Sequence, residues 1–204
     1  MSLAVTAVGE ATRDRILRLA DQLFAEHGYP RVSMRMVATA AGVTKPALYY
    51  HFRNKDALFE ECVLATQKRM GEMLAGAASS GATLEERLRA VAHILLTGSP
   101  HHPVLIQNDI AEHLPPEVRE RLDQGFRSTV FGPLTTLFSE AGGRGDLRTG
   151  ITDGVAATAM LGVCMAFLPG APAAGAAPEG PVAEIVGDVL LWGVGSRPET
   201  ADGP

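Results

Sequence analysis

The segment between residues 28 and 54 is divided by closely spaced helix breaks and caps. Gly28 follows a stretch in which apolar residues recur at helical spacing, and Gly42 interrupts the next such stretch. Ser33 and Thr44 each precede a helical repeat, where a hydroxyl can accept hydrogen bonds from the first backbone N–H groups. Two short helices joined by a tight turn that contains glycine are typical of a helix-turn-helix. This segment therefore predicts that architecture.

The rest of the chain also has helical periodicity. A helix at 11–27 precedes the segment, and Asn54 is expected to cap a long helix that ends near residue 76. No period-two strand pattern persists, so the sequence predicts an all-α protein of about nine helices. The expected later elements are helices over 83–97, 103–113, 116–141, 152–168 and 181–194, a turn at 142–145, a loop at 169–180, and flexible tails at 1–10 and 196–204.

Charge is distributed unevenly along the chain, whose net charge is −5. Residues 1–70 contain ten Lys and Arg against seven Asp and Glu, a net of +3. Residues 71–204 contain eight against sixteen, a net of −8. A basic first part favours an anionic partner for that part alone, although ordinary charge scatter is the alternative.

Composition and hydropathy favour a cytoplasmic protein. The two cysteines lie far apart and form no CxxC pair, and the first residues lack the apolar run of a signal peptide. Residues 154–168 are uncharged, but a membrane-spanning helix needs about 20 apolar residues. We therefore expect this stretch to be a buried or interface helix, with no membrane association.

Residues 44–51 have the side chains that a DNA-recognition helix needs. Lys45 can donate to guanine, and the methyl group of Ala47 can contact a thymine methyl. Tyr49 and Tyr50 can donate to phosphate oxygens, as can His51 and Lys55, and Arg35 can reach a phosphate or a base. The alternative is that these aromatic residues only fill a core.

The run from Thr12 to Phe59 closely resembles the DNA-binding domain of TetR/AcrR-type transcriptional regulators. The resemblance is carried by the strings LYYHF at 48–52 and NKDAL at 54–58, together with residues 16–28, 36–38 and 41–43. It covers 48 of the 204 residues. It implies a DNA-binding domain at 11–56 and a ligand-sensing and dimerisation domain at 57–195. The DNA-binding residues that it implies are Ser33, Arg35, Thr44, Lys45, Pro46, Ala47, Tyr49, Tyr50, His51 and Lys55.

The resemblance also implies a homodimer on a palindromic double-stranded DNA operator. The last two expected helices combine small residues, which permit close approach, with larger apolar ones. Their alternative role is the core of a single subunit. The residues expected at the dimer interface are Ala156, Ala159, Val163, Val189 and Trp192.

The middle helices are expected to surround an apolar pocket for a hydrophobic small molecule that releases a repressor from DNA. Each proposed lining residue could instead be plain core. The residues expected to line the pocket are Met73, Leu95, Phe126, Val130, Phe138, Met160, Cys164 and Phe167.

Other functions are less consistent with the sequence. The histidines at 93, 101, 102 and 113 lack metal-ligand spacing, and no nucleophile or phosphate-loop motif is present, so we expect neither an enzyme nor a cofactor. A helical protein that has lost DNA affinity is a third class. An activator, or a regulator controlled by a protein partner, stays as the alternative function. The expected location is the cytoplasm, in association with the nucleoid.

Overall fold

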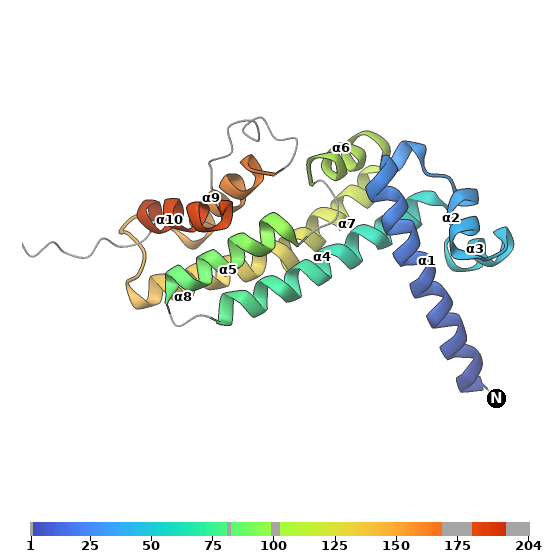
Figure 1. Cartoon of the computed structure of the whole chain (residues 1–204), viewed down its shortest axis with the longest axis horizontal. Helices are drawn as coiled ribbons and strands as arrows, with labels where there is room; N and C mark the ends of the chain where they lie inside the picture. The colour runs from blue at the N-terminus through green and yellow to red at the C-terminus, as the bar shows by residue number, and fades with distance from the viewer. Residues whose placement is uncertain (1, 81–82, 99–102, 169–180, 195–204) are drawn as a thin grey trace, which may run out of the picture. The chain divides into compact units, whose positions relative to one another are not determined.

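The computed structural model describes residues 2–80, 83–98, 103–168 and 181–194, and their regular elements are helices (Figure 1). Because α7, η1 and α8 follow one another without a break, the described residues form nine helical stretches, and the predicted all-α fold is confirmed. The elements are α1 (Ser2–Arg31), α2 (Met34–Ala41), α3 (Lys45–His51), α4 (Lys55–Ser80), α5 (Leu84–Thr97), α6 (Pro103–His113), α7 (Pro116–Phe126), η1 (Arg127–Phe131), α8 (Gly132–Arg144), α9 (Asp153–Ala166) and α10 (Val182–Val194).

The chain divides into two compact units. Unit 1 contains Met1–Gln67 and Pro100–Phe126, and unit 2 contains Lys68–Ser99 and Arg127–Pro204. The helix α4 contributes its first half to unit 1 and its second half to unit 2. This division differs from the expected boundary at residue 57, because Leu114, Val118 and Leu122 pack into the core of the first unit.

Aromatic side chains form the centre of the core of unit 1. The ring of Phe24 meets that of Phe59 edge-on at 4.8 Å, and the ring of Tyr29 lies 5.0 Å from Phe59. Leu48 of α3 and Phe52 at its end are almost completely buried in the same core. The helix-turn-helix is therefore held by contacts to both α1 and α4.

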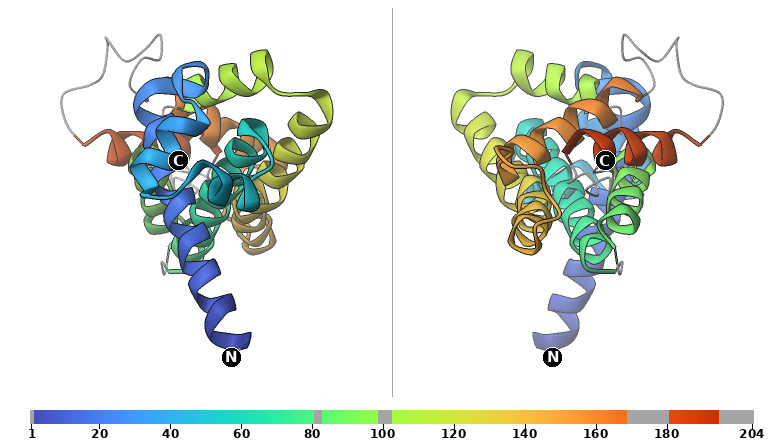
Figure 2. Two further views of the ribbon diagram at one scale, coloured as in Figure 1. Left: turned by 90° about the vertical axis from the view of Figure 1, so that its right-hand side faces the viewer. Right: turned by 90° about the vertical axis from the view of Figure 1, so that its left-hand side faces the viewer.

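Four helices supply most of the contacts within unit 2. The helix α10 packs on α5 and α9 packs on α8, and α9 and α10 also contact each other (Figure 2). The core of unit 2 includes four completely buried side chains, namely Leu88, Leu134, Phe138 and Met160. Burial also raises the pKa of the Cys164 thiol to about 12, as expected for a cysteine that acts as a small core residue.

Several element boundaries differ from the sequence prediction. The first helix begins at Ser2 rather than near residue 11, and α4 continues to Ser80. The helix α8 extends through the expected turn, which begins only at Gly145, where φ is 78°. The expected loop at 169–180 and the tail at 196–204 lie outside the described residues.

The long helix predicted over 116–141 is interrupted by a π-helical turn at Arg127–Phe131. Pro133 explains the interruption, because proline has no N–H to donate to the carbonyl of Thr129 and its ring would clash with that carbonyl in a regular helix. The sequence prediction overlooked this proline.

No helix in the described part of the chain is both long and apolar enough to span a membrane.

Candidate nucleic-acid interface

Side-chain caps define both helices of the helix-turn-helix, as the sequence predicts. Ser33 Oγ accepts a hydrogen bond from the Met36 N–H at 3.3 Å, and Thr44 Oγ1 accepts one from the Ala47 N–H at 3.3 Å. Between them, Gly42 adopts a left-handed conformation with φ 62° and ψ 35°. A residue with a Cβ rarely adopts this backbone conformation, so glycine permits the tight turn.

The helix α3 buries one side and exposes the other. Leu48 is completely buried, and Val43 packs partly into the same core. Tyr50 is 86% exposed and Tyr49 is 42% exposed. A ring that only fills a core leaves little of its surface exposed. The alternative that both rings fill the core is therefore wrong.

Most of the other predicted DNA-binding residues of the helix-turn-helix are exposed as well. Lys45 Nζ lies 5.8 Å from the centre of the Tyr49 ring, and the Tyr50 and His51 rings meet edge-on at 5.3 Å. Ala47 and His51 are half-buried, and the remaining predicted residues of this group are exposed. These are Ser33, Arg35, Thr44, Lys45 and Pro46. We call the exposed parts of residues 31–53 the basic surface.

Lys55, which the sequence predicts to contact a phosphate, makes contacts within its own chain in this structure. Its Nζ is 4.0 Å from the centre of the Tyr29 ring and 3.4 Å from the Pro30 carbonyl oxygen, to which it donates. Burial lowers the pKa of this ammonium group below its usual value, although Asp56 and Asp109 oppose the effect. In this structure the side chain holds the corner between α1 and α2, and its contact with phosphate stays a prediction.

Arg13 joins α1 to the other elements of unit 1. Its guanidinium lies 5.3 Å from the centre of the Phe52 ring and forms an ion pair with Glu61 of α4. An arginine in two such contacts positions its neighbours rather than standing alone in solvent. The structure thus gives Arg13 a role in holding the end of α3.

Two exposed arginines were absent from the sequence prediction. Arg31 ends α1 and Arg53 follows α3, and both are exposed. A sequence pattern identifies them: residues 27–55 contain five Lys and Arg but no Asp or Glu. An acid-free run of this length concentrates positive charge on the helix-turn-helix despite the negative net charge of the chain.

The residues expected to line an effector pocket do not share one environment. Phe126 belongs to unit 1, and the other seven belong to unit 2. Four of the seven are buried in the core, namely Val130, Phe138, Met160 and Cys164. Met73, Leu95 and Phe167 are half-buried. None of the eight lines the groove between α4 and α8 that is described below.

The expected dimer residues also separate into two groups. Ala156 is completely buried within unit 2. Its small side chain therefore packs inside its own unit, and the prediction that it lies at the interface between subunits is corrected. Ala159 and Val163 are half-buried, whereas Val189 is 55% exposed and Trp192 65% exposed. Val155, 60% exposed, adds an apolar side chain that the sequence prediction did not include.

Comparison with curated proteins relates the chain to bacterial regulators. The family model of bacterial regulatory proteins of the tetR family matches residues 16–62. The transcriptional repressor KstR2 of Rhodococcus jostii is 32% identical over 146 residues, which are 70% of this chain and 66% of KstR2. The regulator AcrR of Shigella flexneri is 39% identical over 64 residues, 31% of this chain and 30% of AcrR. The chain thus spans less than two thirds of either relative.

Solved structures share the fold over most of the chain. A TetR-family regulator from Mesorhizobium loti has a TM-score of 0.72 and 20% identity, and the match covers 92% of this chain and 98% of that one. AibR, solved with isovaleryl coenzyme A and operator DNA, has a TM-score of 0.61 and 24% identity, with 88% and 96% of the two chains covered. With the capped helix-turn-helix, the family match at 16–62 and the long KstR2 alignment, we conclude that the chain belongs to the TetR family of bacterial regulatory proteins.

Proposed function

We propose that this chain is a transcriptional regulator that binds a palindromic operator as a homodimer, with α3 in the major groove. The observation that carries the proposal is the basic surface, which lies in an acid-free run of 29 residues, 27–55, that includes α3. A recognition helix needs short or polar side chains at its first turn, and Thr44, Lys45 and Ala47 meet this need.

The residues divide into two roles. Lys45 and Ala47 are placed on the first turn of α3 to contact base edges, which gives sequence specificity. Arg31, Arg35 and Arg53 are exposed cations at the margins of α2 and α3 and would contact phosphates, which gives affinity without sequence preference. Tyr50 adds an exposed hydroxyl that can donate to a phosphate oxygen.

The proposal is tested by titrating the chain into fluorescent duplexes from the region upstream of its own gene, at several salt concentrations. Loss of one phosphate contact in Arg53→Ala should reduce the slope of log affinity against log salt by about one unit per contact. Arg69→Ala is the matched control, because Arg69 is an exposed cation of α4 outside the basic surface. Equal slopes for the two variants would remove Arg53 from the interface.

Lys55→Ala separates the two roles open to that residue. A direct phosphate contact predicts a uniform loss of affinity across DNA sequences and a smaller salt slope. A positioning role, through the Tyr29 ring, predicts lower stability with an unchanged slope. If Lys55→Ala leaves operator affinity, slope and stability unchanged, neither role holds.

We also propose that the chain is a ligand-released repressor. KstR2 is named a repressor, and the AibR structure holds both an acyl coenzyme A and operator DNA. The side chains expected to contact an effector in this chain are all apolar, which suits a hydrophobic small molecule. Binding would move α4, which begins beside the helix-turn-helix and continues into unit 2. A coupling of about 1–3 kcal/mol would change operator affinity about 5–150-fold.

The test of this second step is operator binding in the presence of hydrophobic ligands. A ligand that binds the chain tightly and leaves DNA affinity unchanged would contradict the release mechanism while leaving DNA binding intact. A rise in affinity would show a ligand that strengthens operator binding, which also contradicts release. The names of the relatives support a regulator that is not an enzyme, and we propose the cytoplasm as its location.

A further inference from the structure

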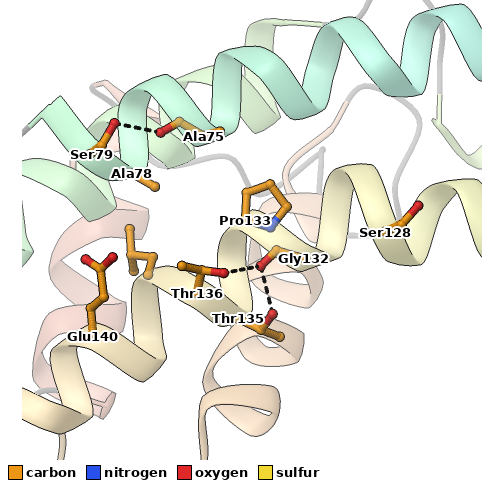
Figure 3. A pocket seen from close by; sticks show the side chains of 10 residues that line it. Ala75, Ala78, Ser79, Ser128, Gly132, Pro133, Thr135, Thr136 and Glu140 are labelled. Carbon is orange, nitrogen blue, oxygen red and sulfur yellow. Dashed lines mark hydrogen bonds between the residues drawn. The ribbon is translucent and has the colours of Figure 1, made fainter.

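A groove lies between the second half of α4 and the run formed by η1 and α8, all within unit 2. Its volume is about 470 Å³, which is in the range of small-molecule sites. Figure 3 shows Ala75, Ala78 and Ser79 of α4 on one side, with Thr136 and Glu140 of α8 facing them. The residues of the expected effector pocket are all different ones.

The groove is lined mostly by small side chains of α4 and of the η1–α8 run, which approach closely at one point. Gly71, two turns of α4 before Ser79, has no Cβ, and a Cβ there would collide with the Thr129 carbonyl oxygen of η1. Ala75 and Ala78 then continue the α4 wall without filling the space, and Pro133 contributes the facing apolar surface. The apolar part of the lining therefore includes Ala75, Ala78 and Pro133.

Three hydroxyl groups of the groove, those of Ser79, Thr135 and Thr136, present lone pairs rather than protons. Ser79 Oγ donates to the Ala75 carbonyl oxygen at 2.9 Å. Thr135 Oγ1 and Thr136 Oγ1 both donate to the Gly132 carbonyl oxygen, at 2.8 and 3.1 Å. Because each hydroxyl has one proton and that proton is used within its own helix, only the acceptor function is left for a ligand.

Glu140 is the one charged side chain among the described residues that line the groove. Its Oε2 accepts a hydrogen bond from Arg87 at 3.0 Å, and the Glu140 side chain is 53% exposed. The ion pair orients the carboxylate, and its second oxygen can accept from a ligand. The Glu140 carboxylate and the three hydroxyl groups thus offer acceptors, and Glu140, which is paired with Arg87, is the charged group of the lining.

We infer that this groove is a binding site for small amphipathic amines, with the ammonium group donating to Glu140 and to the threonine hydroxyls and the apolar body lying on Ala75, Ala78 and Pro133. An ammonium group has three N–H donors, and these can bond to the Glu140 carboxylate and to the hydroxyl oxygens, which act only as acceptors. The site goes beyond DNA binding and effector release, and its occupation is measurable on the DNA-free chain.

The experiment compares three probes with the same phenyl and ethyl groups but different ends: phenethylamine, phenethyl alcohol and phenylacetate. Binding is followed by saturation-transfer NMR, with Kd values from calorimetry. We expect phenethylamine to bind at least tenfold more tightly than the alcohol and phenylacetate not to bind. No binding of phenethylamine up to its solubility limit, or equal binding of all three probes, would overturn the inference.

Variants locate the bound amine. Ala75→Leu fills the groove from an exposed position of α4 and should weaken phenethylamine at least tenfold. Ala65→Leu makes the same change at an exposed position of α4 outside the groove and should alter the Kd less than twofold. Thr136→Val removes one acceptor while keeping the shape and should also weaken binding. Equal affinity in Ala75→Leu and Ala65→Leu would place the amine elsewhere, whatever the outcome of the DNA titrations.

Discussion

The backbone N–H of Tyr29 donates a hydrogen bond to the carboxylate of Asp109 on α6, over a distance of 2.8 Å. Tyr29 directly follows Gly28, whose φ of 74° bends the chain out of a regular helix. A buried N–H at such a bend needs an acceptor from another element. Asp109 supplies that acceptor and ties the end of α1 to α6 within unit 1.

Removal of this carboxylate should destabilise unit 1. We expect Asp109→Ala to lower the free energy of unfolding by about 1–3 kcal/mol, the usual cost of an unsatisfied buried donor. Urea denaturation measures the change. Glu112→Ala is the matched control, because Glu112 is an exposed carboxylate of the same helix, and it should change stability by less than about 0.5 kcal/mol. A neutral Asp109→Ala would show that water replaces the bond.

Stability should also fall in alkaline solution through Tyr29. Burial raises the pKa of its phenol, and the hydroxyl donates to Asp56 at 2.5 Å. Since the unfolded tyrosine ionises near pH 10, the unfolded state loses its proton first, and stability declines as the pH rises above that value. The lowered pKa of Lys55 acts in the opposite direction over the same range, so the comparison must isolate Tyr29.

The measurement is the free energy of unfolding from pH 8 to pH 11, roughly two units below to one unit above the pKa of a free tyrosine. We expect the native chain to lose stability more steeply above about pH 10 than Tyr29→Phe does. Tyr50→Phe is the control, because Tyr50 is 86% exposed, and its slope should equal that of the native chain. Identical slopes in all three proteins would contradict the role given to the Tyr29 phenol.

Two glycines of α4 should respond oppositely to the same substitution. A Cβ at Gly71 would collide with the backbone of Thr129, whereas a Cβ at Gly76 meets no atom within 4 Å. We expect Gly71→Ala to destabilise the chain by about 1–3 kcal/mol or more, because backbone atoms must move. Gly76→Ala should stabilise it by about 0.5–1 kcal/mol through helix propensity. Thermal unfolding compares the two, and equal effects would contradict the close approach of α4 and η1.

The single tryptophan should report association of two chains. Trp192 is 65% exposed in the described chain, beside the exposed Val189 on α10. If these residues form the dimer interface, the emission maximum should shift to shorter wavelength as the protein concentration rises. Val189→Glu should place a charge in the interface and keep the emission at long wavelength at all concentrations. A concentration-independent spectrum, with a monomer in sedimentation, would exclude this interface.

Local patterns in the sequence predicted the helix-turn-helix well, because each of its caps acts on backbone groups only three or four residues away. The hydroxyls of Ser33 and Thr44 and the left-handed Gly42 act on adjacent backbone groups, so the sequence alone identifies them. The long fourth helix and the capping box of Thr83 and Glu86 were predictable for the same reason.

Features that depend on contacts between distant residues could not be predicted in this way. Lys55 has the same sequence pattern whether it faces a phosphate or the Tyr29 ring, and only the packing of α1 against α4 decides between them. Ala156 was expected at an interface because small residues suit any close helix contact, inside a unit or between chains. The groove beside Ala75 required the approach of Gly71 to Thr129, which joins positions far apart in the sequence.

The brevity of α2 and α3 has a consequence for how unit 1 opens. Helices of eight and seven residues are too short to persist in water on their own. Leu48 and Phe52 instead share one core with Phe24 and Phe59. The amide protons of both short helices should therefore exchange with solvent through the same cooperative opening as those in the middle of α1, and none of the DNA-reading elements can unfold alone.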